Sequence, residues 1–368
     1  MHPFSTKDRQ EKMAKYSVIV PVFNRPDEVD ELLDSLTKQS VTDFEVVIVE
    51  DGSTTPCKDV VDKYTDRLDV RYFSKPNSGP GPSRNYGVER ATGEYVLILD
   101  SDVVLPPDYM RAVDMSIKDF PCDAFGGPDR AHESFTDTQK AISYSMTSFF
   151  TTGGIRGGNQ KLDKFHPRSY NMGVRREVYN KLGGFSKMRF GEDIDFSYRI
   201  LEAGYTTRLY TEAWVWHKRR TNFDKFFKQV FNSGIARINL SKRHPGTLKL
   251  VHMLPMVFTV GVILLLVAAV VLRLLATNPN MGDAFLQGYP LGKTRLGWWT
   301  LPLVPVVLYI LLVFIDSTIR NRSAVIGYLS IKSSFVQLFG YGFGFLTAWW
   351  KRCVLRQDEF TAFEKNFY

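Results

Sequence analysis

The chain has 368 residues, 44% hydrophobic and 14% aromatic, which is the composition of a folded protein and excludes a disordered one. Its three cysteines lie far apart without a CxxC pair, which indicates neither a disulfide framework nor a zinc site and fits a reducing cytosol. The formal net charge is +8, and one stretch, residues 217–249, contributes nine basic residues against a single acid.

The first part of the chain, residues 16–221, is predicted to be an α/β domain behind a polar N-terminal extension at residues 1–15. The extension lacks the apolar core of a secretory signal, so we expect the domain to face the cytoplasm. Four apolar runs then alternate with polar or helical stretches: "YSVIVPV" (16–22), "FEVVIV" (44–49), "VRYF" (70–73) and "EYVLIL" (94–99). This alternation predicts a mainly parallel sheet with helices on both faces.

Two helices are predicted between these strands. The first follows Pro26 and has four apolar residues at helical spacing, namely Val29, Leu32, Leu33 and Leu36. The second is "PSRNYGVERATG", which we expect Gly93 to close.

Acidic side chains follow three of the predicted strands. Strand one ends in "PVFNRP", strand two in "VEDGS" and strand four in "LDSD". Because such sheets bind ligands at the carboxyl ends of their strands, four residues are expected around one crevice: Phe23, Asp51, Asp100 and Asp102. An aromatic ring there can stack on a nucleobase, and a carboxylate such as Asp102 can hold Mg²⁺ or Mn²⁺, which offsets the repulsion between the acids. Without the rest of the pattern, a turn or helix cap would explain the two aspartates equally well.

A second acidic cluster, "GEDID", begins a predicted helix that Gly204 closes. One face of this helix is expected to be apolar, with Ile194, Tyr198 and Leu201. Glu192 and Asp193 either stabilise the helix dipole or supply a general base. Asp193 and Asp195 are two positions apart, so their side chains point in different directions and cannot share an ion.

The C-terminal part of the chain is predicted to hold it in a membrane. Residues 222–250 are a basic interfacial helix region, and its expected partners are anionic lipid headgroups and no nucleic acid. The region 251–368 begins with two spans, 251–273 and 296–315, each containing twenty uncharged residues, which is enough to cross a bilayer. Basic residues flank 323–350 on both sides, which favours a re-entrant or interfacial segment over a third span and leaves a short cytoplasmic tail.

Five stretches together resemble the family 2 glycosyltransferases, which have the GT-A fold. They are "SVIVPVFNRPDEVDELLDSLTKQ", "FEVVIVEDGST", "GPSRNYGVERATGEYVLILDSD", "NMGVRREVYNKLGGF" and "GEDIDFSYRILEAG", in the order of the family and within residues 16–240. The resemblance implies an inverting, metal-dependent transfer of a sugar from a nucleotide-sugar donor such as a UDP- or GDP-sugar. The stretch from Trp214 onward is similar to membrane-attached members, which implies a lipid-linked or glycan acceptor at the cytoplasmic membrane.

The resemblance also implies roles for individual residues. Asp193 matches the general base, with Glu192 beside it. Asp100 and Asp102 match the ribose and metal motif, and His217 is either a further metal or diphosphate ligand or an ordinary packing or surface histidine. Donor-binding residues are implied at Pro21, Phe23, Asn24, Asp51, Arg84, Asp100 and Ser101. The glycine-rich, basic segment 152–168 is either a mobile lid over the donor or a surface loop.

Two departures from the family pattern narrow these expectations. Gln229 is not followed by the Arg-Trp pair of processive synthases, which argues against a processive synthase, and Glu50 stands where aspartate is commoner. We expect a transferase that adds one sugar to a membrane-bound acceptor. The alternatives are a polyprenyl-phosphate glycosyltransferase, whose acceptor needs little base catalysis, and a catalytically inactive membrane scaffold that binds nucleotide.

Overall fold

The computed structural model describes residues 14–130, 132, 135–152, 165–218, 222–276, 289–291 and 294–362. The contacts among them form two compact units. The α/β unit contains the described parts of residues 1–134 and 157–218, and the helical unit contains those of residues 135–156 and 219–367. Most of the predicted extension 1–15 and of the predicted lid 152–168 lies outside the described residues.

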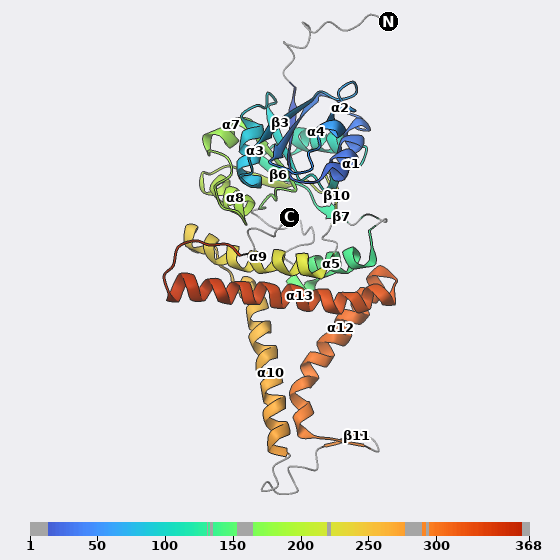
Figure 1. Ribbon diagram of the computed structural model, residues 1–368, viewed down its shortest axis with the longest axis vertical. Coiled ribbons are helices and arrows are strands. Elements are labelled where there is room, and N and C mark those ends of the chain that lie inside the picture. The colour runs from blue at the N-terminus through green and yellow to red at the C-terminus, as the bar shows by residue number, and fades with distance from the viewer. Residues whose placement is uncertain are drawn as a thin grey trace, which may run out of the picture. The chain divides into compact units, whose positions relative to one another are not determined.

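The α/β unit is built on a seven-stranded sheet (Figure 1). The order across it is β3 (Val70–Lys75), β2 (Phe44–Asp51), β1 (Tyr16–Val22), β4 (Tyr95–Leu99), β8 (Asn171–Arg175), β6 (Ala124–Gly126) and β9 (Thr207–Leu209). β1 is parallel to both β2 and β4, and β2 is parallel to β3, so the four predicted strands are confirmed as parallel neighbours. Beyond β4 the sheet is mixed, because β8 runs antiparallel to β4 and to β6.

Helices cover both faces of this sheet, as the sequence predicted. They are α1 (Pro26–Thr37), α2 (Lys58–Asp62), α3 (Pro80–Val88), α4 (Tyr109–Asp119), α7 (Arg176–Lys181) and α8 (Glu192–Glu202). Alternate residues of β1 point to opposite faces, so Val18 and Val20 pack with α1 and α4, and Ile19 packs with α3, α7 and α8. All three side chains are fully buried, and each burial stabilises the fold by roughly 1.5–3 kcal/mol.

The prediction that Gly93 closes a helix is wrong. The helix, α3, ends at Val88, and Gly93 lies in the loop that follows. Its N–H donates to Ser17 Oγ at 2.8 Å, and an added Cβ would lie 2.7 Å from the Ser17 backbone nitrogen. This glycine is therefore needed for a close approach to β1.

The predicted helix at residues 192–202 forms, but with a different buried face. Phe196 and Ile200 are its fully buried apolar side chains, because the Phe196 ring packs 5.1 Å from both the Tyr179 and Phe185 rings. The expected face is only partly buried: Ile194, Tyr198 and Leu201. Gly204 ends the helix as predicted, with a φ of 84° that favours glycine.

The helical unit is organised around α13 (Ala324–Trp349). Figure 1 shows α5 (Asp137–Thr147) and α9 (Phe223–Arg243) packed along it, and α10 (Leu254–Ala276) and α12 (Val304–Asn321) running away from it. The short elements are α6 (Phe149–Thr152), β11 (Tyr289–Leu291) and β12 (Thr294–Leu296). β11 and β12 form an antiparallel pair.

Glycines allow α13 to lie close to its neighbours. A Cβ added at Gly344 would clash with the Phe231 carbonyl oxygen of α9, and one added at Gly342 would clash with Thr259 of α10. Despite these glycines, α13 is one unbroken helix of 26 residues. An unbroken helix agrees with the interfacial form of the predicted segment 323–350 better than with a re-entrant turn.

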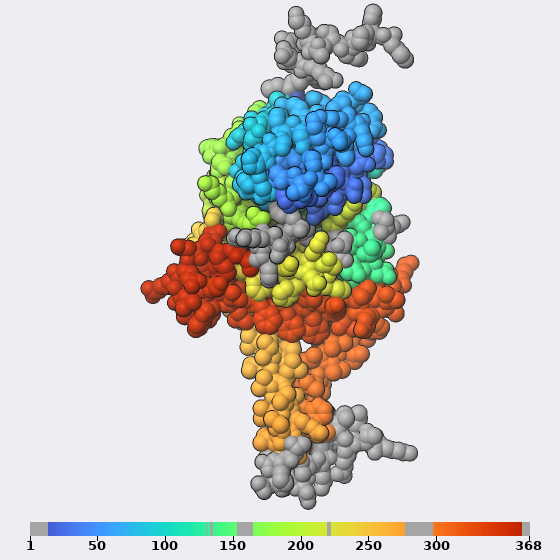
Figure 2. Space-filling model, viewed as in Figure 1, coloured from blue at the N-terminus to red at the C-terminus, as the bar shows by residue number. Residues whose placement is uncertain are grey.

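Two helical segments of the described chain are long and apolar enough to cross a membrane, Leu250–Ala276 and Trp298–Asn321. Their apolar side chains are largely exposed, with Leu264 at 62% and Leu308 at 60%, and Figure 2 shows the open surface of α10. The second segment continues beyond the predicted end at residue 315 to Asn321, and an ion pair of 3.0 Å joins Asp316 and Arg320 in its last turns.

Residues 135–156 pack with the helical unit, whereas the sequence predicted one continuous domain at residues 16–221. The reason is the apolar face of α5. Ile142 and Met146 are buried in a cluster with Phe226 and Val230 of α9. The α/β unit is thus interrupted in sequence by a helix that belongs to the other unit.

Candidate active site

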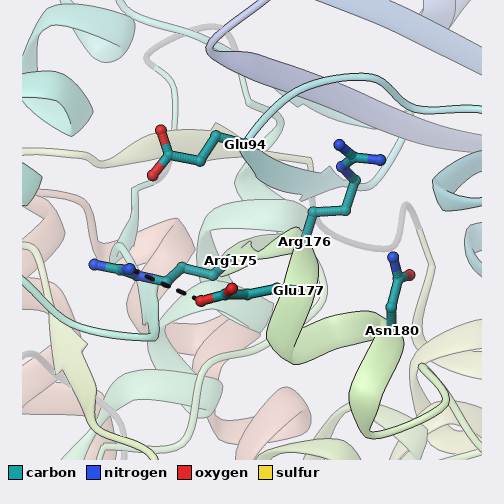
Figure 3. Close-up of a pocket in the computed structure, with 5 residues that line it drawn as sticks. All are labelled: Glu94, Arg175, Arg176, Glu177 and Asn180. Carbon is teal, nitrogen blue, oxygen red and sulfur yellow. Dashed lines mark ion pairs between the residues drawn. The ribbon is translucent and has the colours of Figure 1, made fainter.

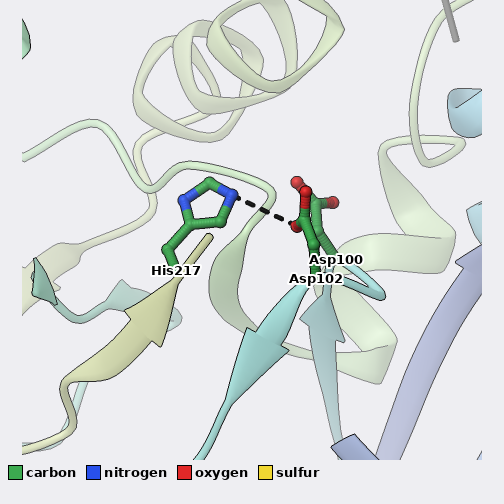
Figure 4. A group of neighbouring side chains, drawn as sticks. All are labelled: Asp100, Asp102 and His217. Carbon is green, nitrogen blue, oxygen red and sulfur yellow. Dashed lines mark ion pairs between the residues drawn. The ribbon is translucent and has the colours of Figure 1, made fainter. Parts of the chain in front are cut away.

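A carboxylate cluster lies at the carboxyl ends of the parallel strands. Asp100 and Asp102 follow β4, and their oxygens lie within 4.8 Å of each other and of a ring nitrogen of His217 (Figure 4). His217 Nε2 is 3.3 Å from Asp102 Oδ1. Ligand atoms that share one ion at about 2.1–2.3 Å lie within roughly 4.6 Å of each other, and oxygen and imidazole donors suit Mn²⁺ or Mg²⁺. These three side chains therefore fit a divalent cation.

Strand pairing brings His217 to this cluster. A second sheet has the order β5 (Val103–Val104), β10 (Val215–His217) and β7 (Asp129–Arg130). β10 runs antiparallel to β5 with His217 opposite Val103, the residue after Asp102. The Lys218 N–H donates to the Asp102 carbonyl oxygen at 3.0 Å and fixes this register.

Two further residues lie beside the His217 ring. The Tyr170 ring stacks on it with the centroids 4.9 Å apart and the planes at 22°. Asp129 Oδ2 is 3.9 Å from His217 Nδ1, on the side of the ring away from Asp102. A carboxylate beside the remote nitrogen orients a ligating imidazole and increases its basicity.

Two arginines balance the charge of the carboxylates. The Arg25 guanidinium lies 3.3 Å from Asp102 Oδ2. Arg84 is buried and donates to Asp100 Oδ1 and to Glu192 Oε1, both at 2.8 Å. Burial works against a charged Arg84, but the two carboxylates outweigh it and raise the pKa of its guanidinium. Arg84 therefore connects the tip of β4 to the start of α8.

The two acids at the start of α8 have opposite electrostatic environments. Burial raises the pKa of Glu192 to about 7, against the effect of Arg84 and with a contribution from Asp193. Burial also acts to raise the pKa of Asp193, but the Arg168 guanidinium outweighs it, so that this pKa is lowered. Arg168 Nε donates to Asp193 Oδ2 at 2.7 Å, and the Ile194 N–H donates to Asp193 Oδ1 at 2.8 Å.

Two predicted donor-binding residues at the tips of β1 and β2 accept hydrogen bonds from backbone N–H groups of neighbouring loops. The Asn24 side chain accepts from the backbone N–H groups of Thr54 and Thr55 at 2.8 and 3.0 Å. The Asp51 carboxylate accepts from the N–H groups of Ser78 and Gly79 at 2.9 and 2.8 Å and also pairs with Lys75. Three further predicted donor residues also lie at strand tips, namely Pro21 in β1, Phe23 after it and Ser101 between the two aspartates.

A cavity of about 410 Å³ lies at the opposite end of the sheet (Figure 3). It is lined by Glu94, Arg175, Arg176, Glu177 and Asn180, around the start of β4 and the end of β8. Its charged side chains include Arg175 and Glu177, whose side chains are 4.0 Å apart. The cavity thus lies at the end of the sheet opposite the acidic cluster, next to the start of β4.

Comparison with known proteins assigns the domain. Residues 17–183 match the family described as glycosyl transferase family 2. This stretch is a family 2 glycosyltransferase domain. A fold comparison agrees: the mannosyltransferase PcManGT from Pyrobaculum calidifontis, in complex with GDP-Man and Mn²⁺, aligns with a TM-score of 0.55 over 93% of this chain and 89% of that one, at 14% identity. The glycosyltransferase domain therefore has the GT-A fold.

Curated relatives match shorter stretches of the chain. Poly(ribitol-phosphate) beta-N-acetylglucosaminyltransferase TarS of Staphylococcus aureus is 44% identical over 94 residues, which is 24% of this chain and 16% of that protein. Chondroitin synthase of Pasteurella multocida is 39% identical over 105 residues, 28% of this chain and 11% of that protein. The chain thus matches well under a fifth of the length of either relative.

Most of the polar side chains that the structure brings together here were predicted as site residues from the sequence. The structure brings together Asp100, Asp102, His217, Arg84 and Glu192, and it places Asp193 in an ion pair at the start of α8. Sequence reasoning missed four residues, namely Arg25, Asp129, Arg168 and Tyr170. Arg25 follows strand one and Arg168 ends the basic segment 152–168, so the place of each residue in the sequence could have indicated that it lies near the site. Asp129 and Tyr170 carry no sequence signal.

Proposed function

We propose that the chain is an inverting, metal-dependent glycosyltransferase that moves a sugar from a nucleotide-sugar donor to a membrane-associated acceptor on the cytoplasmic face. The observation that carries the proposal is the cluster of Asp100, Asp102 and His217 at the strand tips of a family 2 domain. A UDP- or GDP-sugar is the proposed donor, and the GDP-Man named with the mannosyltransferase of similar fold supports a nucleotide sugar of this kind.

The side chains of the site suit displacement at an anomeric carbon. A divalent cation held by the cluster would supply Lewis-acid stabilisation of the leaving diphosphate. Arg84 holds Asp100 and Glu192 in fixed positions, and Arg25 does the same for Asp102. The acceptor oxygen attacks the face of the sugar opposite the diphosphate, and Asp193 is the proposed base that takes its proton.

The predicted membrane attachment is part of the proposal. The exposed apolar surfaces of α10 and α12 support two spans, and the unbroken α13 supports an interfacial helix. α9 adds basic residues on an amphipathic helix, which suits the surface of an anionic bilayer. Residues 16–221 would then form the catalytic region, 222–250 the interfacial region and 251–368 the membrane region.

The test is a screen of UDP- and GDP-sugars for thermal stabilisation and hydrolysis by the full-length protein, with and without Mn²⁺. We expect stabilisation by one donor that depends on Mn²⁺. We also expect Asp102→Asn to lower donor turnover by at least 100-fold. Wild-type turnover by this variant would contradict the proposal.

A second candidate acceptor is a lipid phosphate, which the ion pair of Asp193 with Arg168 favours. A carboxylate whose pKa is lowered is a weak base, and an ionised phosphate oxygen has no proton to lose. Asp193→Asn separates the two candidates. A loss of turnover supports a hydroxyl acceptor, whereas retained turnover supports a phosphate acceptor.

A further inference from the structure

The short segment before β8 is attached to α8 by consecutive residues of the α/β unit. The His166 ring lies 4.9 Å from the Tyr198 ring, and the Ser197 hydroxyl donates to the Pro167 carbonyl oxygen at 2.8 Å. Arg168 is the next residue along the chain. These contacts give its backbone a defined place beside α8, so its side chain reaches the first turn of that helix.

The Arg168 guanidinium serves a single acid. Its Nε donates to Asp193 Oδ2 at 2.7 Å, and its side chain donates a hydrogen bond to no other residue in the described part of the chain. Arg84, by comparison, divides its donors between Asp100 and Glu192. Of the two adjacent acids that begin α8, Asp193 therefore has a cation that it does not share.

The Asp193 carboxylate is fixed at both of its oxygens. Oδ2 accepts from Arg168, and Oδ1 accepts from the Ile194 N–H at 2.8 Å. Rotation of the carboxylate would break both hydrogen bonds. Each oxygen retains a second lone pair, and 11% of the Asp193 side-chain surface is exposed, so an acceptor hydroxyl can still reach this carboxylate.

The charge of Asp193 also depends on this contact. The charged groups that act on it from the described residues are Glu192 on its own helix, Arg84 of α3 and Arg168. Burial raises the pKa of Glu192 to about 7, and it acts on Asp193 in the same direction, but Arg168 outweighs it there and lowers the pKa of Asp193. Without Arg168, burial and the repulsion from Glu192 would act to raise this pKa as well.

We propose that Arg168 is a positioning residue for sugar transfer: it fixes the Asp193 carboxylate and makes Asp193, rather than Glu192, the acid that carries the negative charge. The inference rests on the proposed function, in which Asp193 is the base. The acceptor O–H bond breaks and its proton passes to Asp193, while the acceptor oxygen forms the bond to the anomeric carbon. The nucleoside diphosphate leaves with the electron pair of the bond that breaks. Only an ionised carboxylate can take that proton.

The first test is the pH dependence of kcat for donor hydrolysis by the full-length protein in detergent, with Mn²⁺ and the UDP- or GDP-sugar that the screen identifies. Water is the acceptor in this assay. We expect wild-type kcat to be level from pH 8 down to about pH 5, and Arg168→Gln to have about 10-fold lower kcat at pH 5.5 and to recover as the pH rises. Arg168→Lys should restore the wild-type profile. Arg199→Gln is the matched control, because Arg199 pairs at 3.1 Å with Asp195 of the same helix, and its acid limb should stay in place.

Thermal unfolding without donor gives a second readout that does not depend on turnover. In the wild type the lowered pKa of Asp193 contributes stability that is complete above its ordinary pKa and is lost as the pH falls. In Arg168→Gln we expect this pKa to be raised, so that the contribution is present at low pH and is lost as the pH rises. The Tm of Arg168→Gln should therefore fall by roughly 2–4 °C more than that of the wild type between pH 5 and pH 8. Asp193→Asn in the same background should remove the extra fall.

The outcomes separate the inference from the proposed function. An acid limb that does not move in Arg168→Gln, or a Tm profile that matches the wild type, overturns the inference. A loss of kcat that is equal at every pH and is not restored by Arg168→Lys also overturns it, because a purely structural role would explain that result. If the wild type turns over no nucleotide sugar, the proposed function fails, and the Tm profile alone decides whether Arg168 sets the charge of Asp193.

Discussion

His217 reaches the carboxylates through the pairing of β10 with β5, and its ring is held by Tyr170 and faces Asp129. If it is a metal ligand, its loss should weaken the metal and leave the fold intact. We expect His217→Ala to raise the Kd for Mn²⁺ by about 10–100-fold, as measured by isothermal titration calorimetry. His166→Ala, which removes an imidazole outside the cluster, is the control. Unchanged Mn²⁺ affinity in His217→Ala would remove this residue from the site.

Glu192 gives the unliganded protein a stability that depends on pH. Its folded pKa is raised to about 7 from an ordinary 4.5, so its contribution to stability is complete below pH 4.5 and is lost as the pH rises through 7. We expect the Tm to fall by roughly 5 °C between pH 5 and pH 8 because of this group. Glu192→Gln should reduce the fall, and an identical profile in the variant would show that another group is responsible. The measurement is a thermal-shift series without donor or metal.

The residues of the site differ in how far sequence could predict them. Asp100 and Asp102 were predictable, because an apolar strand that ends in acids in a parallel sheet puts those acids at the ligand edge. The contact of His217 with Asp102 depends on strand pairing between residues 115 positions apart, which no local pattern indicates. The Asp193–Arg168 pair likewise joins residues 25 positions apart, and no local pattern in the sequence indicates this contact.

At the scale of elements, the glycines of α13 lie in a continuous helix although glycine has a low intrinsic helix propensity. Glycine weakens an isolated helix, which made the segment 323–350 difficult to predict. In the structure Gly340 and Gly344 face α9, where any side chain would collide with Val230 or with the Phe231 backbone. Packing against neighbouring helices therefore stabilises α13 more than its own sequence does.

This packing predicts the effect of adding one methyl group. We expect Gly344→Ala to destabilise the helical unit by about 1–3 kcal/mol through overpacking against α9. Gly261→Ala in α10 is the matched control, because an added Cβ there meets nothing within 4 Å, and it should be neutral or stabilising. Thermal unfolding in detergent compares the two. Equal effects would mean that the close contact of α13 with α9 is absent in solution.

At the scale of the whole molecule, the chain does not divide at a single point. A fragment of residues 1–221 retains α5 but lacks α9 and α13, which cover its apolar side chains Ile142 and Met146. We expect this fragment to aggregate, and the double change Ile142→Glu and Met146→Glu to return it to the soluble fraction. Size-exclusion chromatography measures the outcome. A monodisperse unmodified fragment would show that the prediction of one continuous domain at 16–221 is adequate.

The membrane topology gives a further prediction for the full chain. If α10 and α12 cross the bilayer and α13 does not, a reporter fused after residue 285 should be periplasmic, and reporters fused after residues 320 and 368 should be cytoplasmic. The paired reporters alkaline phosphatase and green fluorescent protein distinguish these locations. A periplasmic signal after residue 368 would mean that the segment 323–350 spans the membrane.

The contact of α5 with α13 also has a consequence for biosynthesis. The Ser333 hydroxyl donates to the Ala141 carbonyl across 192 positions of sequence, so α5 leaves the ribosome long before the helix that covers it. At about 5–20 residues per second, this interval is of the order of 10–40 s. During that time the apolar face of α5 has no partner within the nascent chain. We therefore expect chaperones or the insertion machinery to bind this face until the last helix is translated.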